Sequence, residues 1–245
     1  MRLLVLFLWS FTPFALGAQS ASPGLLTVYF SERPPLSMVE GQRGVLLEAT
    51  KVFLTEAGLK ARFIELPSNR ILELLRSGPS DALGVGWFKT PDREVWAHYS
   101  PAIYQDGPLV ALVNARLVSS LPAVLRLDAL LASPLTLGLQ TGASLGRVVD
   151  EKIRALGLVP MESVVDPPTL LRMIRDGRMD YTLLCEEEAV YLVAHDPTLA
   201  PGIVMVRLAD APPGNLRHLM YSPGLDPSIT ARLNAAIERV QASGQ

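Results

Sequence analysis

Apolar positions along the chain alternate between short runs of strand-forming residues and longer segments with helical spacing. The run 25–30 (LLTVYF) is rich in strand formers and ends at a turn-like segment with two prolines. After Gly44, apolar residues recur every three or four positions, and Gly58 follows where such a helix is expected to end. The same alternation continues with a strand at 61–66, a helix that starts at a Ser68 cap and stops at Gly78, and a strand at 82–86.

A second copy of this pattern lies about a hundred residues further along the chain. Residues 75–81 (LRSGPSD) match residues 174–180 (IRDGRMD), and in both copies an apolar strand is expected directly after the aspartate. Upstream, the second copy has its own strand at 135–139 and a helix that runs from a Ser144 cap to Gly157. The repetition predicts two similar strand–helix–strand lobes.

Alternation of strands and helices predicts an α/β fold in which each lobe is a small, mostly parallel sheet flanked by helices. The apolar stretch 107–117 is expected to cross between the lobes, and a strand at 218–222 to return to the first lobe before a last helix that Asp226 caps. The expected organisation is residues 19–112 in lobe 1, 113–215 in lobe 2 and 216–245 in lobe 1 again. Two crossings would leave a cleft between the lobes, where small-molecule sites are common.

The first 18 residues are typical of a signal peptide for secretion. Arg2 precedes an apolar stretch that is too short to span a membrane, and small residues place cleavage near Gly17 or Ala18. The chain has 22 basic and 24 acidic residues and a mean hydropathy of +0.28, which argues against nucleic-acid binding and against disorder. We therefore expect a periplasmic protein whose mature chain does not insert into a membrane. Its single cysteine, Cys185, can form no internal disulfide.

Candidate binding residues follow the strands, because ligands of open α/β sheets lie beyond the carboxyl ends of parallel strands. After the strand at 82–86 come two aromatic residues, Trp87 and Phe88, and then Thr90 as a helix cap. Arg93 lies in the first turn of that helix, where the dipole does not favour a cation, so a carboxylate partner is plausible. The alternative is that Arg93 pairs with its acidic neighbours on a solvated face.

In the second lobe, the segment Gly142-Ala143-Ser144 precedes a helix and can present backbone N–H groups to an anion, or it can be a simple helix cap. Glu186, Glu187 and Glu188 can accept from an ammonium group or can favour a helix dipole without any ligand.

Residues 142–146 also match the G-x-S-x-G pattern of a hydrolase nucleophile, with Ser144 as the serine. Asp180 and then His195 or His218 follow in the required order, but no HGGG-like oxyanion segment precedes the serine. The three histidines of the chain are isolated from one another, so neither a metal nor a cofactor is expected.

Several motifs in a fixed order resemble one known family. They are Arg33–Leu36 after the first strand, Gly41 and Gly44–Val45, the segments 75–81, 89–93 and 98–104, the segment 142–144, and residues 177–180. Together they resemble the type 2 periplasmic solute-binding proteins, in particular the polar amino acid family that serves ABC transporters, over nearly the whole mature chain.

The resemblance implies roles for several residues. Arg93 matches the arginine that binds the α-carboxylate of a ligand, with help from groups near Thr90 and Ser144, and Trp87 and Phe88 match wall positions. The acidic residue that receives the α-ammonium falls at Cys185, with Glu186 beside it. Either Glu186 replaces that acid, or the ligand is not an α-amino acid.

The implied function is capture of a small carboxylate-bearing solute, with an amino acid as the first expectation, by closure of the lobes on it. The expected partners are this solute and an inner-membrane ABC permease, and the protein is expected to be a monomer. The alternatives are a dehydratase-like lyase that uses Glu186, a Ser144 hydrolase, and the ligand-binding module of a sensor.

Overall fold

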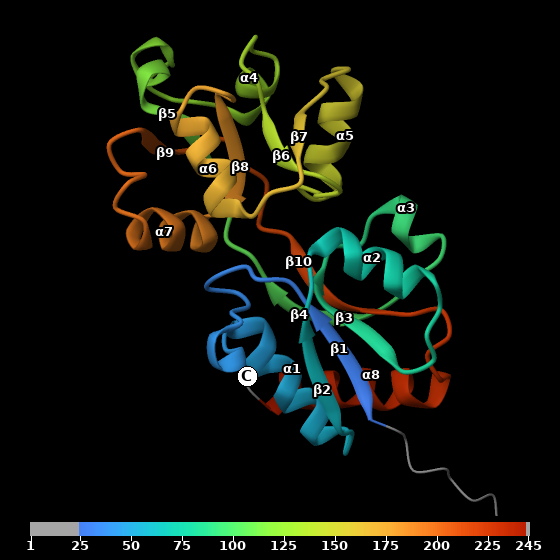
Figure 1. Cartoon of the computed structure of the whole chain (residues 1–245). Helices are drawn as coiled ribbons and strands as arrows, with labels where there is room; N and C mark the ends of the chain where they lie inside the picture. The colour runs from blue at the N-terminus through green and yellow to red at the C-terminus, as the bar shows by residue number, and fades with distance from the viewer. Residues whose placement is uncertain (1–24, 244–245) are drawn as a thin grey trace, which may run out of the picture.

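The computed structural model describes residues 25–243, so the proposed signal peptide at 1–18 lies outside the described residues. Two lobes are joined by two segments of the chain that run between them (Figure 1). Within the described part, no helix is long and apolar enough to cross a membrane.

The first lobe contains a five-stranded sheet with the order β2-β1-β3-β10-β4. Its strands are β1 (Leu26–Phe30), β2 (Ala61–Glu65), β3 (Ala82–Trp87), β4 (His98–Gln105) and β10 (Leu216–Tyr221). Its helices are α1 (Val45–Glu56), α2 (Ser68–Arg76), α3 (Pro91–Glu94) and α8 (Pro227–Ser243), with a short 3-10 turn at Glu40–Gln42. Only β10 runs against its neighbours, since it pairs antiparallel with both β3 and β4.

The second lobe contains a three-stranded sheet, β8-β5-β9, beside the pair β6-β7. Its strands are β5 (Leu109–Asn114), β6 (Gly138–Gln140), β7 (Met161–Ser163), β8 (Tyr181–Cys185) and β9 (Ile203–Arg207). Its helices are α4 (Leu127–Leu131), α5 (Arg147–Ala155), α6 (Pro167–Arg175) and α7 (Glu186–His195), with a 3-10 segment at Ala115–Ser120. A parallel bridge between Leu137 and Tyr181 joins the two groups of strands.

The two lobes repeat one topology. With the bridge included, the second lobe has the order β7-β6-β8-β5-β9, and only β5 runs against its neighbours. The repeated aspartates have the same role, because Asp81 accepts a hydrogen bond from the Thr27 hydroxyl on β1, and Asp180 accepts one from the Thr136 N–H just before β6. The predicted class, mostly parallel sheets in two similar lobes, is confirmed.

Apolar side chains fill both faces of each sheet. In the first lobe, α1 and α8 cover one face, and α2 covers the other with Ile71 and Leu75. In the second lobe, α4 and α5 cover one face, and α6 and α7 the other. All of β5 pairs within the second lobe, so the lobe boundary expected after residue 112 falls inside this strand.

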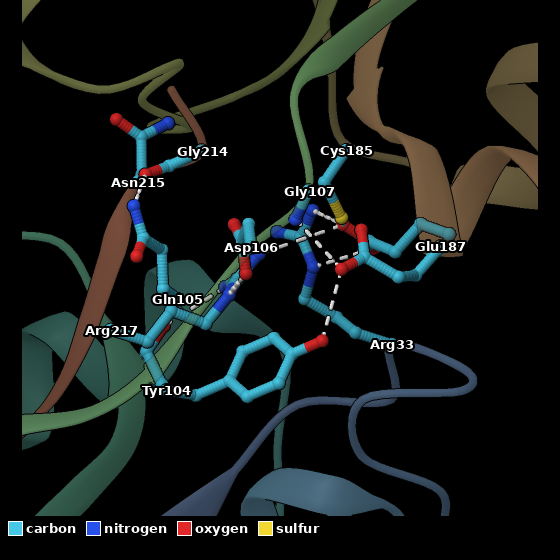
Figure 2. A network of polar contacts seen from close by, with 12 residues as sticks. Arg33, Tyr104, Gln105, Asp106, Gly107, Cys185, Glu187, Gly214, Asn215 and Arg217 are labelled. Carbon is cyan, nitrogen blue, oxygen red and sulfur yellow. Dashed lines mark hydrogen bonds and ion pairs between the residues drawn. The ribbon is translucent and has the colours of Figure 1, made fainter.

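The two crossings lie side by side between the lobes. The Asp106 N–H donates to the Asn215 carbonyl at 3.0 Å, and the Gln105 side chain donates to the Gly214 carbonyl at 3.2 Å (Figure 2). Gly214 is required here, because a Cβ at that position would lie 1.6 Å from the Asp106 carbonyl oxygen. The close approach fixes where the two lobes meet.

Candidate functional site: a cleft between the lobes

A cavity of about 270 Å³ opens between the lobes and is lined by both. The first lobe supplies residues that follow β1, β2 and β3, and the second supplies the loops after β6 and β7. This is the position that the parallel strands predict, because strand ends of both lobes face the cavity. Its size suits a small solute.

Arg93 is the guanidinium that the first helical turn after β3 presents to this cavity. It lies over the indole ring of Trp87 at 5.0 Å, and its Nη2 donates to the Gly142 carbonyl of the other lobe at 3.0 Å. Among the described residues, no carboxylate lies within ion-pair distance of it. Burial lowers the pKa of Arg93, because it disfavours the charged form of the guanidinium. An anion placed beside Arg93 would stabilise that charged form.

Trp87 positions Arg93 and belongs to the core at the same time. Its side chain is 8% exposed and packs with Ile71 and Leu75 of α2. The indole nitrogen points back toward Gly84, where a Cβ would lie 2.5 Å from it, and it has no hydrogen-bond partner among the described residues. Trp87 therefore offers the cleft a ring face and no donor.

The loop after β6 is held in shape by Asp150 of α5. This carboxylate accepts from the Ser144 hydroxyl at 2.5 Å and from the Leu145 N–H at 2.9 Å. Within residues 25–243, the N–H groups of Gly142 and Ser144 have no acceptor, so both can donate to an anion in the cavity. Helix α5 begins only at Arg147, with Gly146 at its cap, so Ser144 does not cap it as the sequence predicts.

A second group of charges lies between the lobes, beside the crossings (Figure 2). Arg33, which follows β1, holds Glu188 of α7 through two hydrogen bonds of 2.9 Å. Arg217 of β10 donates to Asp106 at 2.5 Å and lies 3.7 Å from the Glu188 carboxylate. The side chains of Asp106, Glu188 and Arg217 are almost fully buried. Both arginines also line the cavity.

These contacts move the pKa values of the buried acids in opposite directions. Burial alone would raise the pKa of Glu188, but the charges of Arg33 and Arg217 outweigh it and hold that pKa below its usual range. Burial raises the pKa of Asp106, and Arg217 only partly offsets the effect. Burial also raises the pKa of the Cys185 thiol, which disfavours its thiolate form.

Five of the eight candidate residues line the cavity and three do not. Those that line it are Trp87, Phe88, Arg93, Ala143 and Ser144. Thr90 is at the N-cap position of the short helix α3, where its side chain makes no capping hydrogen bond. Cys185 is buried with its Sγ 3.2 Å from Glu188, and neither residue lines the cavity. Glu186 lies in a separate surface groove and pairs with Arg207 of the same lobe.

Helical geometry explains why the three neighbouring glutamates separate. Successive residues of a helix point about 100° apart. Glu186 therefore reaches Arg207, Glu187 accepts from Tyr104 and the Gly107 N–H, and Glu188 enters the space between the lobes.

Arg33 and Arg217 line the cavity, and neither is among the eight residues that the sequence indicates. Arg33 stands inside the Arg33–Leu36 motif, but neither residue is near its acidic partner in the sequence. Phe88, which the sequence does indicate, contacts one of these arginines, because the Arg217 guanidinium lies over its ring at 4.6 Å.

Comparisons with known proteins bear on the fold. No protein-family model matches the chain, and no curated protein matches it in sequence. Solved structures do match. An ancestral arginine-binding protein bound to arginine has a TM-score of 0.72 at 18% identity, covering 91% of this chain and 95% of its own.

Two further matches are the sensor domain of a kinase and the precursor of an enzyme. A histidine kinase sensor domain with similarity to periplasmic binding proteins has a TM-score of 0.71 at 16% identity, covering 91% of this chain and 93% of its own. An ancestral amino acid-binding protein that is a precursor of cyclohexadienyl dehydratase has a TM-score of 0.68 at 18% identity, covering 90% and 91%. At these identities the matches establish the fold, and they confirm that the chain has the two-lobed fold of the type 2 periplasmic solute-binding proteins.

Proposed function

We propose that this protein captures a small carboxylate-bearing solute in the periplasm by closing its two lobes on it. The observation that carries the proposal is Arg93, a guanidinium that lines the cavity between the lobes and has no carboxylate within ion-pair distance among the described residues. A carboxylate can take two parallel hydrogen bonds from such a group. The N–H groups of Gly142 and Ser144, from the other lobe, complete a site for the same anion.

The arrangement supports binding by closure, because the donors of one anion come from two lobes. Amino acids are the ligands named for two of the similar structures, and they are the first class to test. We further propose that the protein acts as a monomer, delivers its solute to an inner-membrane ABC permease, and reaches the periplasm through the signal peptide at 1–18.

Alanine at Arg93 tests the proposal. We expect Arg93→Ala to abolish the thermal stabilisation that amino acids or small carboxylates give the mature protein, with little change in its unfolding without solute. A ligand at a hundredfold excess over its dissociation constant adds about 2.7 kcal/mol, which a melting curve resolves. Arg76→Ala is the matched control, because Arg76 stacks on Trp96 at 5.9 Å and does not line the cavity. Undiminished binding by folded Arg93→Ala would refute the proposal.

The enzyme alternatives have less support from the geometry. The Ser144 hydroxyl donates to Asp150, whereas His195 and His218 bond to the carbonyls of Tyr191 and Ser100. Glu186, the acid expected in a lyase, is paired with Arg207 outside the cavity. Recovery of the bound solute unchanged after prolonged incubation separates binding from turnover.

A further inference from the structure

The charged residues that line the cavity are sorted by depth. Three arginines, Arg33, Arg93 and Arg217, are buried or half-buried. The three acids, Glu32, Glu65 and Asp166, are all exposed. The interior of the cleft is therefore lined by cations, and its carboxylates stand at the mouth.

The buried carboxylate of Glu188 is paired with two arginines that line the cavity. Both oxygens of Glu188 accept from Arg33, one of them also from the Cys185 thiol, and Arg217 lies 3.7 Å away. Arg33 itself lines the cavity, whereas Glu188 does not. The guanidinium thus stands between this carboxylate and a solute.

Two of the three acids at the mouth also have local partners. Glu32 accepts from the Val39 N–H at 2.5 Å. Asp166 accepts from the Thr169 N–H at 2.8 Å and caps helix α6. The third acid at the mouth is Glu65. It is exposed at the end of β2, where water screens its charge.

We infer that the cleft selects carboxylates without an ammonium group, such as 2-oxo acids, 2-hydroxy acids and dicarboxylates, over α-amino acids. This inference rests on the proposed function and narrows its ligand class. An ammonium group brought in beside Arg33 and Arg217 loses water and meets two guanidinium groups, and the described residues that line the cavity offer it no buried carboxylate. A keto or hydroxyl oxygen instead accepts from Nη1 of Arg33, which has no hydrogen-bond partner among the described residues.

Calorimetric titration of the mature protein with matched solutes tests the inference. Each L-amino acid is paired with the 2-oxo and 2-hydroxy acid of the same carbon skeleton, and succinate and glutarate are added. For every skeleton that binds, we expect the oxo or hydroxy acid to bind roughly tenfold tighter or more, the effect of leaving one buried charged donor without a partner. Tighter binding of the amino acids overturns the inference and leaves the proposed function standing. Failure of all carboxylates to bind refutes both.

Two variants show which group sets the preference. Arg33→Met removes the guanidinium that covers Glu188, so the preference should move toward the amino acid by about tenfold. In the double variant Arg33→Met with Glu188→Gln, the shift should disappear, because no carboxylate is uncovered. Glu188→Gln alone leaves Arg33 and Arg217 without this acid, so the preference for the oxo or hydroxy acid should stay or increase. If Arg33→Met leaves the ratio of the two affinities unchanged, Arg33 does not set the preference and the inference is wrong.

Discussion

Gly84 of β3 links the core to the binding cleft through Trp87, and Gly84→Ala tests this link. A Cβ at this position would lie 2.5 Å from the indole nitrogen of Trp87 and 2.9 Å from a methyl group of Leu75. Ordinary contacts are about 3.5 Å or longer, so the indole has to move by about 1 Å. Trp87 is 8% exposed and packed on α2, so it cannot move outward without disturbing the first lobe.

The expected cost follows from the crowding. Extra atoms in a well-packed core cost about 1 to 3 kcal/mol, and we expect about 2 kcal/mol here because the obstacle is a rigid ring. For a chain of this size, that loss lowers the melting temperature by about 4 to 8 °C. Binding should weaken as well, because Trp87 carries the Arg93 guanidinium at 5.0 Å. Loss of that stacking corresponds to about threefold to tenfold in affinity.

Urea unfolding and calorimetric titration of Gly84→Ala measure the two effects. A double-mutant cycle with Trp87→Phe supplies the control, because phenylalanine lacks the ring nitrogen that meets the new methyl group. In the Trp87→Phe background, we expect alanine at Gly84 to cost about 1 kcal/mol less than in the native protein, because only the close contact with Leu75 remains. An equal cost in both backgrounds would mean that the indole does not meet the new methyl group, and the link from Gly84 to Arg93 would be refuted.

Two further predictions concern the charges between the lobes. The pKa of Glu188 is held below its usual range, so the stability that this carboxylate contributes is complete above the unfolded pKa of about 4.3 and is lost as the pH falls through the folded pKa. When unfolding is measured at decreasing pH, the native protein should therefore lose more stability than Glu188→Gln does. Parallel curves of stability against pH would contradict this. Asp106→Asn removes the negative charge that Arg217 pairs with, and the Arg217 side chain is 4% exposed, so the free energy of unfolding in urea should fall by about 3 kcal/mol. A loss below about 0.5 kcal/mol would show that Glu188 alone balances Arg217.

Local pattern predicts most of the secondary structure of the lobes. Helix α1 and strands β1, β2 and β3 begin and end within one or two residues of where apolar spacing and glycines place them. Strands β4, β7 and β9 have no comparably clear pattern. Strand β7 spans three residues, two of which are exposed, and it forms through its pairing with β6. Composition and spacing also bring attention to Arg93, because it follows a strand end.

The sequence by itself determined the repeated lobes, the cleft between them and one guanidinium facing it. Only the tertiary structure decided which carboxylate lies beside that cleft and what covers it. Cys185, Glu186 and Glu188 are neighbours in the chain, but helical rotation sends them to different surroundings, and Arg33, the partner of Glu188, is 155 residues away. Charge pairing over that distance depends on how two lobes meet, and no local pattern of residues encodes it.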